Sequence, residues 1–341
     1  MTQPSLFPIV LVTGATSGLG RNAALWLQQA GYTVIGLGRD QQAGAELAKQ
    51  GVKFVACDLS TAEPAALQAL VHQVDWVWHC AALSAPWGDK QAFMAANVVA
   101  TQKLAQAAGQ AGVQRFVHIS TPSLYFDFQN RQQIPESFVA RTFANMYAQT
   151  KFIAEGCIQQ AQQQYPKTRF TMLRPRGIFG PYDRVIVPRL QEQLARFDGV
   201  LKLPRGGEAY VDLTFALNVV HAMQLASTQP NLPPAAVYNI SNQEPMVLRD
   251  VIDTLFRQEL GHDIRIQAVP YHVLYAVATG MEAVAKITGK EPMLTRYSVG
   301  ALSFDMTLCP RNAQQELGYY PLYSMQQSIA LTAQWLQQQQ R

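Results

Sequence analysis

Charged residues are scarce in this chain. Asp, Glu, Lys and Arg make up only 15% of its 341 residues, the formal net charge is +4, and no stretch concentrates Lys and Arg. A nucleic-acid partner is therefore not expected, because such a partner is usually met by a basic patch or stripe. Hydrophobic residues make up 48%, which is typical of a globular protein long enough to bury a core.

Cysteines are few, and long apolar runs are missing. The four cysteines stand at positions 57, 80, 157 and 309 without a Cys-x-x-Cys pair, which argues against a metal site or a disulfide scaffold and fits a reducing cytoplasm. The first ten residues do not have the pattern of a signal peptide. The most apolar stretch, 271–288, is interrupted by polar and charged residues, so it predicts an amphipathic helix rather than a membrane span.

Short apolar runs alternate with helical patterns along the first half of the chain. The predicted strands are 8–13, 33–38, 53–58, 76–81, 115–120 and 169–174. The predicted helices between them are 41–50, 63–73, 90–111 and 141–164. This alternation predicts an α/β fold with a Rossmann-like, doubly wound parallel sheet.

A glycine-rich turn, VTGATSGLG, joins the first strand to a helix. Gly14, Gly18 and Gly20 would let the backbone approach a pyrophosphate, whose charge the helix N-terminus stabilises. After the first strand of an alternating chain, this turn predicts a dinucleotide-binding site, and a plain strand-to-helix turn is the alternative.

After Pro175 the regular alternation of strand and helix patterns ends. We therefore expect a dinucleotide-binding domain over 1–175 and, over 176–341, mainly a smaller mixed substrate lobe with segments that return to the main sheet.

The end of the second strand indicates which dinucleotide binds. An acidic residue there would hold the ribose of NAD, but this chain has Gly38, then Arg39, then Asp40. Arg39 favours the 2′-phosphate of NADP. NAD remains the alternative, with Arg39 solvated and Asp40 on the ribose. Asp58, after the third strand, is expected to bind the adenine amino group, to cap the following helix, or to do both.

Tyr147 and Lys151 stand four residues apart in NMYAQTK. Residues at this spacing share one face of a helix, so the ammonium is expected near the phenol. A neighbouring cation, including oxidised nicotinamide, would lower the pKa of the tyrosine toward working pH. Tyr147 would then give a proton to a carbonyl oxygen as hydride arrives, or take one from an alcohol. A surface pair without function is the alternative.

The order of the motifs resembles that of extended short-chain dehydrogenases/reductases, in the NAD(P)-dependent epimerase/dehydratase superfamily. The resemblance covers nearly the whole chain and runs through TGATSGLG, HCAAL, HISTPSLY, YAQTK and LRPRGIFGP. It implies that Tyr147 is the acid/base and that Lys151 tunes it and binds the nicotinamide ribose.

The resemblance assigns further positions. Thr121 matches the hydroxyl that holds the substrate oxygen, with Ser120 and Ser123 as alternatives, and Asn97 matches an asparagine that supports the active site. The residues it implies in cofactor binding are Gly14, Thr16, Ser17, Gly18, Leu19, Gly20, Arg39, Asp58, Leu59, Ala81, Ala82, Tyr147, Lys151, Pro175 and Gly177.

The C-terminal half is similar to the 3β-hydroxysteroid dehydrogenase-like branch, which includes sterol 4-carboxylate dehydrogenases and bacterial 2-alkyl-3-oxoalkanoate reductases. Val211 stands where nucleotide-sugar members carry an arginine, and EPMLTRYS (291–298) and QELGYYPLYS (315–324) match the branch. The resemblance implies an NADP-dependent oxidoreductase acting on a secondary alcohol or ketone of a hydrophobic small molecule. It also implies a homodimer formed through the helices that carry Asn97 and Tyr147.

Two other functions stay open at this point. One is a nucleotide-sugar epimerase or dehydratase, and the other is a non-catalytic NADP-binding sensor, although such relatives usually lose the tyrosine. The chain also departs from the family pattern twice. Its glycine turn reads G-x-x-x-G-x-G, with Ser17 inside it, and Leu217 replaces the aspartate expected before Asn218.

Overall fold

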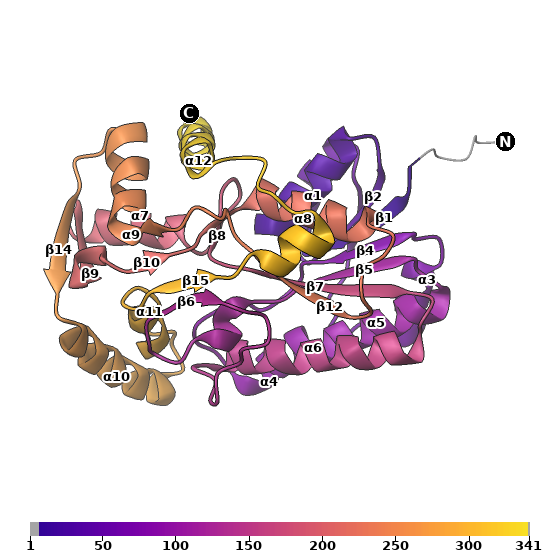
Figure 1. Ribbon diagram of the computed structural model, residues 1–341, viewed down its shortest axis with the longest axis horizontal. Coiled ribbons are helices and arrows are strands. Elements are labelled where there is room, and N and C mark those ends of the chain that lie inside the picture. Colours follow the sequence, from indigo (N-terminus) through magenta and orange to yellow (C-terminus); the bar gives the residue numbers. More distant parts are fainter. Residues whose placement is uncertain (1–6, 340–341) are drawn as a thin grey trace.

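The computed structural model describes residues 7–339 (Figure 1). Residues 1–6 and 340–341 lie outside the described residues. They include most of the stretch where we expect no signal peptide, and the end of the Gln-rich tail.

A parallel sheet of seven strands forms the centre of the fold, in the order β12-β7-β5-β4-β1-β2-β3. Its strands are β1 (Ile9–Thr13), β2 (Thr33–Gly38), β3 (Lys53–Ala56), β4 (Trp76–His79), β5 (Arg115–Ile119), β7 (Arg169–Pro175) and β12 (Ala236–Ile240). The order reverses between β1 and β4, and ligands of open α/β sheets bind at the carboxyl ends of strands beside such a reversal.

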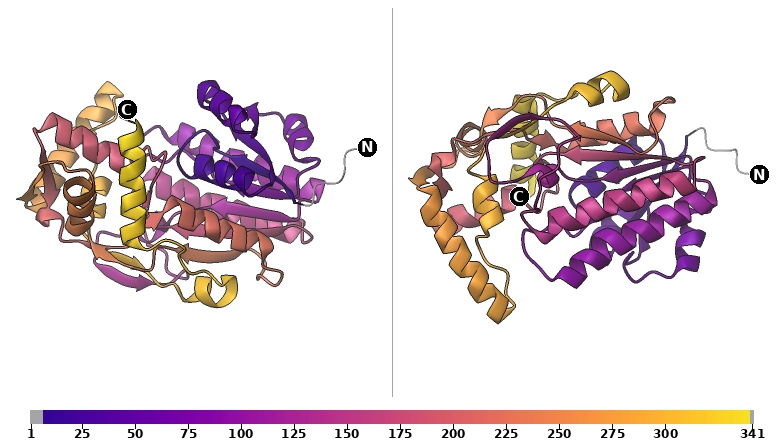
Figure 2. Two further views of the ribbon diagram at one scale, coloured as in Figure 1. Left: turned by 90° about the horizontal axis from the view of Figure 1, so that it is seen from above. Right: turned by 60° about the horizontal axis from the view of Figure 1, so that its bottom comes forward.

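Helices cover both faces of this sheet (Figures 1 and 2). On one face lie α1 (Gly18–Gln29) and α8 (Ala216–Thr228), which pack on Val10 and Val12 of β1. The other face is covered by α3 (Pro64–Val71), α5 (Ala100–Ala111) and α6 (Met146–Gln164), which pack on Leu11 and its neighbours. Alternate residues of one strand are thus buried on opposite faces, as expected for a parallel sheet covered on both sides. The predicted α/β, Rossmann-like fold class is confirmed.

Several predicted boundaries were wrong, including the end of the helix predicted over 63–73, which lies at Val71. The helix predicted over 141–164 begins at Met146, because the Asn145 side chain accepts the Ala148 N–H (2.9 Å) and caps the helix. The strands predicted over 53–58 and 76–81 end at Ala56 and His79. The helix predicted over 90–111 is continuous, but it consists of α4 (Lys90–Phe93), the π-helix η1 (Met94–Val99) and α5. The second helix is α2 (Gln41–Lys49).

The C-terminal half forms a mixed lobe beside the carboxyl ends of the main strands. Its helices are α7 (Val187–Arg196), α9 (Leu248–Asp253), α10 (Tyr271–Thr288), α11 (Arg296–Ala301) and α12 (Met325–Gln339). Its strands are β8 (Ile178–Phe179), β9 (Val200–Pro204), β10 (Tyr210–Val211), β11 (Thr214–Phe215), β13 (Met246–Val247), β14 (Arg265–Val269) and β15 (Met306–Leu308). The strand β6 (Arg131–Ile134), from the first half, pairs with β15. Because β12 and α8 pack with the main sheet, we propose the division into 1–175 and 176–341 with those two elements returning.

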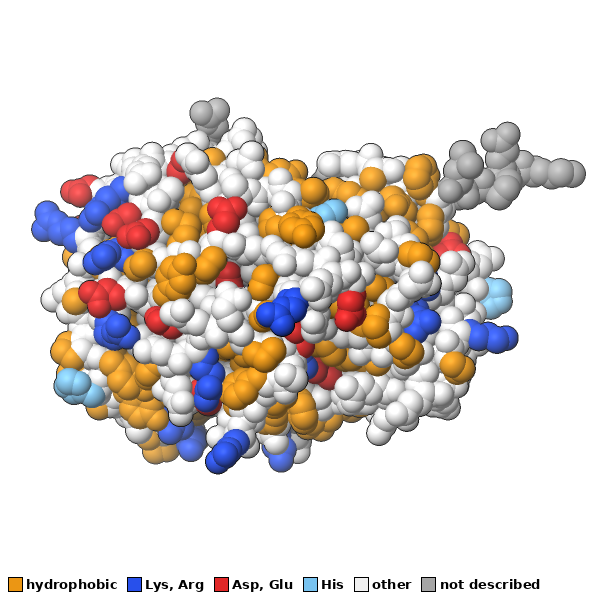
Figure 3. All heavy atoms as spheres, viewed as in Figure 1, with side chains coloured by type: hydrophobic (Ala, Val, Ile, Leu, Met, Phe, Trp, Pro, Cys, Tyr) orange, Lys and Arg blue, Asp and Glu red, His pale blue; other side chains and the backbone are white. Residues whose placement is uncertain are grey.

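The structure can be compared with what the sequence argued against: a membrane span, a metal site and a basic surface patch. Within residues 7–339, no helix is both long and apolar enough to cross a membrane. The same residues contain no group of three or more His, Cys, Asp or Glu side chains placed to hold a metal ion. On the face shown in Figure 3, Lys and Arg side chains are interspersed with Asp and Glu.

A buried ion pair joins α6 to the main sheet. The Arg174 guanidinium on β7 donates to both carboxylate oxygens of Glu155 on α6, at 2.8 and 2.5 Å, and to the Tyr125 hydroxyl at 2.6 Å. The Ser120 hydroxyl donates to the same carboxylate. Both charged side chains are about 5% exposed, so removing one partner would leave the other charge buried and unpaired.

The substitution Glu155→Gln tests this pair. We expect it to lower the free energy of unfolding by about 3–5 kcal/mol, because the Arg174 charge stays buried without a counter-charge. Urea denaturation measures the change. The matched control is Glu291→Gln, which breaks the half-exposed pair with Arg189 and should lower the same free energy by less than about 1 kcal/mol. Equal changes in the two variants would show that the buried pair has no special role.

Candidate active site

The glycine turn forms a close contact between β1 and α1. Gly14 has a φ of +68°, and a Cβ atom on Gly20 would lie 2.2 Å from the Gly14 carbonyl oxygen. Neither position tolerates a side chain in this conformation. The first-turn amides of α1 have no partner within the helix, and the Gly18 N–H is taken by the Tyr182 carbonyl (3.0 Å). The turn thus fits a dinucleotide pyrophosphate, which the amides of Leu19 and Gly20 would hold when it is bound.

The end of β2 has no room for an acidic side chain. A Cβ atom on Gly38 would lie 2.6 Å from Thr16 Cγ2. Asp40 caps α2 by accepting the Ala43 N–H (3.0 Å), and this bond lowers the pKa of Asp40. Arg39 is three-quarters exposed, with its guanidinium 3.7 Å from Asp58 Oδ2. A second arginine, Arg184, reaches the same corner and lies 3.6 Å from Asp40 Oδ2.

Asp58 forms a turn after β3. Its Oδ1 atom accepts the Ser60 N–H (2.9 Å) and the Ser60 hydroxyl (2.6 Å), and the hydroxyl bond is the main cause of its lowered pKa. The expectation that Asp58 caps the following helix was wrong, because α3 begins at Pro64 with Glu63 at its N-cap position and the Asp58 carboxylate closes a turn onto Ser60 instead. Its contact with adenine stays a prediction.

Asn97 joins three elements inside the protein. It is fully buried in η1; its Oδ1 accepts the Leu83 N–H (2.7 Å), and its Nδ2 donates to the Leu83 carbonyl (3.2 Å) and to the Thr150 hydroxyl on α6 (3.0 Å). The loop that contains Ala81 and Ala82 is thereby fixed against the helix that carries the tyrosine. Asn97 therefore positions the site through other residues.

The Tyr147 phenol lies beside two hydroxyls, those of Thr121 and Ser84. Burial raises the pKa of Tyr147, and both hydroxyls oppose this change. The direction differs from the lowered pKa expected from the Tyr147–Lys151 spacing. The Lys151 ammonium bonds to the Ile119 carbonyl, and it is not among the groups that shift the pKa of Tyr147. Burial is therefore not compensated by a cation in the described structure.

Lys151 points into the protein interior. It is 1% exposed, and its ammonium donates to the Ile119 carbonyl (2.6 Å) and lies 2.9 Å from His118 Nε2. Burial lowers the pKa of Lys151 to about 7 and that of His118 well below its usual value. The two contacts anchor Lys151 to the end of β5, and they leave one N–H donor of a protonated ammonium for a ligand.

The three candidate hydroxyls at the end of β5 differ in their contacts. Ser120 donates to the Glu155 carboxylate (2.5 Å), as part of the buried ion pair. Thr121 accepts the Ser123 N–H (3.1 Å), which caps the short helix η2 (Pro122–Tyr125), and donates to the Ser123 hydroxyl (3.0 Å). Of the three, Thr121 is the one whose hydroxyl lowers the pKa of Tyr147, and its catalytic role stays a prediction.

A cavity of about 610 Å³ lies beside the residues that precede Tyr147. Its lining includes Asn145 and Met146 at the start of α6 and Tyr297 on α11. Aromatic side chains also line it, together with charged groups near its rim. The lining residues are Pro86, Trp87, Gly88, Asp89, Lys90, Phe93, Asp127, Phe128, Thr142, Phe143, Ala144, Asn145, Met146, Tyr275, Glu282, Lys286, Arg296 and Tyr297.

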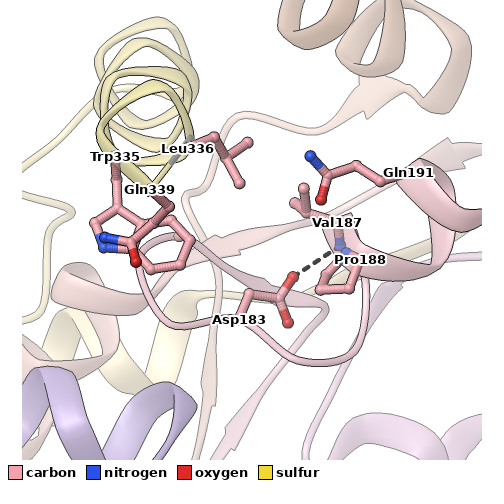
Figure 4. Close-up of a pocket in the computed structure, with 8 residues that line it drawn as sticks. Asp183, Val187, Pro188, Gln191, Trp335, Leu336 and Gln339 are labelled. Atoms are coloured by element: carbon pink, nitrogen blue, oxygen red, sulfur yellow. Dashed lines mark hydrogen bonds between the residues drawn. The ribbon is translucent and has the colours of Figure 1, made fainter. Parts of the chain in front are cut away.

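Another cavity, of about 310 Å³, lies between α7 and α12 (Figure 4). Asp183 is the acidic residue in its lining, and its carboxylate already accepts the Val185 N–H (2.7 Å) and the Val187 N–H (2.8 Å). The predicted catalytic residues line neither of the two cavities, but the 610 Å³ cavity is lined by Met146, next to Tyr147 in the chain, and the cavity between α7 and α12 has no such neighbour of Tyr147.

Sequence reasoning missed four residues at the Tyr147 site: Ser84, His118, Tyr297 and Arg176. His118 and Arg176 stand inside motifs that were noticed, HISTPSLY and LRPRGIFGP, but no spacing rule marks them. The Tyr297 hydroxyl bonds to the Ser123 hydroxyl (2.7 Å), and it comes from the EPMLTRYS motif far along the chain. Only the fold could bring this residue to Tyr147.

Known proteins resemble this chain in both sequence and structure. The family model described as "NAD dependent epimerase/dehydratase family" matches residues 10–241, so the chain belongs to this family. The chain is 45% identical to the uncharacterized protein YbjS of Escherichia coli (96% of this chain, 97% of that one). It is 31% identical to a 2-alkyl-3-oxoalkanoate reductase of Shewanella oneidensis (93% and 84%) and 28% identical to the human sterol-4-alpha-carboxylate 3-dehydrogenase, decarboxylating (95% and 87%). These relatives confirm the predicted resemblance to extended dehydrogenases and reductases of the 3β-hydroxysteroid dehydrogenase-like branch.

Solved structures match the fold. The structure of UDP-glucuronic acid 4-epimerase from Bacillus cereus in complex with NAD superposes with a TM-score of 0.72 at 20% identity (97% of this chain, 96% of that one). At this identity the likeness shows the fold alone.

The buried Lys151 predicts a pH-dependent stability. Folding lowers its pKa from 10.5 to about 7, so the unfolded state binds more protons between these values and stability rises with pH there. Relative to Lys151→Met, the wild type should gain up to about 1.4 kcal/mol of unfolding free energy per pH unit between about pH 7.5 and 9.5. Urea denaturation at several pH values measures this difference. Parallel pH profiles for the two proteins would contradict the lowered pKa.

Proposed function

We propose that this protein is an NADP-dependent oxidoreductase that transfers hydride between nicotinamide and a secondary alcohol or ketone of a hydrophobic molecule. The observation that carries the proposal is the Tyr147 phenol beside the Thr121 and Ser84 hydroxyls, next to a cavity with aromatic side chains. The names of the Shewanella and human relatives support a substrate that resembles a 3-oxoalkanoate or a sterol. Both named substrates carry a carboxylate on the carbon next to position 3.

Each side chain around Tyr147 has a separate role in the proposed reaction. When bound, the cofactor supplies or accepts the hydride. Tyr147 donates the proton to the substrate oxygen during reduction and accepts it during oxidation, while Thr121 and Ser84 hold that oxygen. Lys151 stays anchored at Ile119 and offers its remaining N–H to the nicotinamide ribose. Burial raises the pKa of Tyr147, so the phenol is protonated at neutral pH, which is the form that donates a proton during reduction.

Two alternatives receive less support. A nucleotide-sugar epimerase would be expected to clamp a diphosphate with an arginine at position 211. Here that position holds Val211, which is buried in the core of the C-terminal lobe. A non-catalytic sensor has no use for the hydroxyls that converge on Tyr147.

The substitution Tyr147→Phe tests the proposed acid/base. It removes one hydroxyl and keeps the ring, so we expect turnover of a hydrophobic 3-ketone to fall by a factor of about 10³ or more, with NADPH affinity changed less than about threefold. Initial rates and NADPH fluorescence titration measure the two quantities. Phe at 147 with turnover close to that of the wild type would refute the assignment. A wild type that binds NADPH but turns over no carbonyl compound would favour the sensor.

We also propose that Arg39 and Arg184 bind the 2′-phosphate of NADP. Both guanidinium groups lie at the end of β2, and their contacts with Asp58 and Asp40 are longer than 3.5 Å and solvent-exposed. Such pairs contribute little energy, so both arginines are available to a phosphate, which binds arginine well.

The substitution Arg39→Ala should raise the Kd for NADPH about tenfold and leave the Kd for NADH nearly unchanged, because only NADPH carries the 2′-phosphate. Adding Arg184→Ala should increase the difference. Fluorescence titration with both coenzymes measures it, and Arg311→Ala, at an exposed position, is the charge-matched control. Equal effects on NADPH and NADH would remove Arg39 from the 2′-phosphate site.

We propose that the protein works as a cytoplasmic homodimer, formed through η1, α5 and α6. The support is that Phe152 and Ile153 on α6 are 42% and 37% exposed, and exposed apolar side chains of this size are typical of contact surfaces.

A further inference from the structure

Arg176 begins the loop that follows β7. Its N–H donates to the Ile240 carbonyl (3.1 Å), and its carbonyl accepts the Thr214 hydroxyl (2.6 Å). The backbone of this residue is therefore fixed on both sides. Because β7 pairs with β5, Arg176 stands beside the strand end that leads to Thr121.

The partly buried Arg176 side chain has no hydrogen-bond partner among the described residues. Its Nε atom is buried without a hydrogen bond, and the guanidinium forms no hydrogen bond or ion pair with any of residues 7–339. Arg174, two residues earlier, donates to Glu155, to Tyr125 and to the Glu136 carbonyl. The two arginines near the end of this strand thus differ in whether the protein supplies hydrogen-bond partners for the guanidinium. A desolvated cation without a partner is unfavourable, and such groups gather at functional sites.

Asp212 does not neutralise Arg176 by direct contact. The two side chains interact electrostatically, but Asp212 Oδ2 accepts the Leu308 N–H (2.7 Å), and its Oδ1 is buried without a hydrogen bond. Burial raises the pKa of Asp212 and lowers that of Arg176. The Nε–H of the guanidinium therefore stays buried without a partner, and its terminal N–H groups bond to none of the described residues.

Tyr297 connects Arg176 to the reaction site. Its phenol interacts electrostatically with both Arg176 and Tyr147, and it lines the 610 Å³ cavity. Its hydroxyl also bonds to Ser123, which accepts from Thr121. Tyr297 lines the cavity, whereas Arg176 does not, so a molecule would have to extend past Tyr297 to reach both the guanidinium and Tyr147.

We infer that Arg176 binds a carboxylate of the substrate and selects 3-oxo or 3-hydroxy acids over neutral ketones or alcohols. This inference rests on the proposed function. The planar guanidinium offers paired N–H groups that match the two oxygens of a carboxylate. Anchoring the acid at Arg176 and the oxygen at Tyr147 holds the substrate at two points, which fixes the carbon that receives or gives the hydride.

Oxidation of 2-octyl-3-hydroxydodecanoate and of its methyl ester, with NADP, tests the inference. We expect the wild type to show a kcat/KM about 100-fold higher for the acid. The substitution Arg176→Gln should reduce kcat/KM for the acid about 100-fold and change that for the ester less than about threefold. Arg176→Lys keeps the charge but loses the paired geometry, and it should lose activity on the acid to an intermediate degree. The exposed Arg311→Gln is the charge-matched control and should leave both values unchanged.

The outcomes separate the carboxylate site from a structural role. If Arg176 only held Asp212 or the loop in place, acid and ester would lose activity together in Arg176→Gln. That result, or a wild type that does not distinguish acid from ester, would overturn the inference.

A wild type that turns over no compound would count against the proposed function. In that case a binding measurement still tests the inference about Arg176. Calorimetric titration of decanoate and of methyl decanoate into the NADP-loaded protein measures recognition of the acid alone. A preference for the acid that disappears in Arg176→Gln supports the anion site, and equal binding of both compounds contradicts it.

Discussion

One polar face of α6, buried against the ends of β5 and β7, holds the candidate site together. Tyr147, Lys151 and Glu155 follow one another at intervals of four residues, so they share this face. Lys151 bonds to the Ile119 carbonyl, and Glu155 bonds to Ser120 and Arg174. Burying a charged group without partners is unfavourable, so these bonds allow very few positions for the helix. The position of Tyr147 follows from that constraint.

The two arginines of LRPR show how one strand end combines stability and recognition. Arg174 faces α6, where it completes a network that reaches Tyr125 and Asn239. Arg176 lies beyond the strand and interacts electrostatically with Asp212 and Tyr297. The first arginine is satisfied by the protein itself. Under the proposed function, the second is satisfied by the substrate, and this explains how a site with aromatic walls can select an acid.

The sequence was a good guide where the signal is local. Alternating apolar runs predicted the sheet, and the glycine turn predicted the contact that the missing Cβ of Gly20 allows. The spacing of Tyr147 and Lys151 correctly placed them on one helix, yet it did not show that Lys151 turns toward His118. Sequence reasoning also could not separate Ser120 from Thr121, because both follow Ile119, the last residue of β5, where the alternation of a strand no longer fixes the direction of a side chain. Tyr297 and Arg176 were missed because their roles depend on contacts between distant segments and on a partner that Arg176 lacks.

A crystal structure with NADP and a 3-hydroxy acid bound would test the central claim most directly. The account predicts that the hydroxyl oxygen of the acid lies within about 2.6–3.2 Å of the Tyr147 oxygen, with Thr121 beside it and the carboxylate on Arg176. A substrate oxygen out of reach of Tyr147, with the acid bound elsewhere in the cavity, would contradict it.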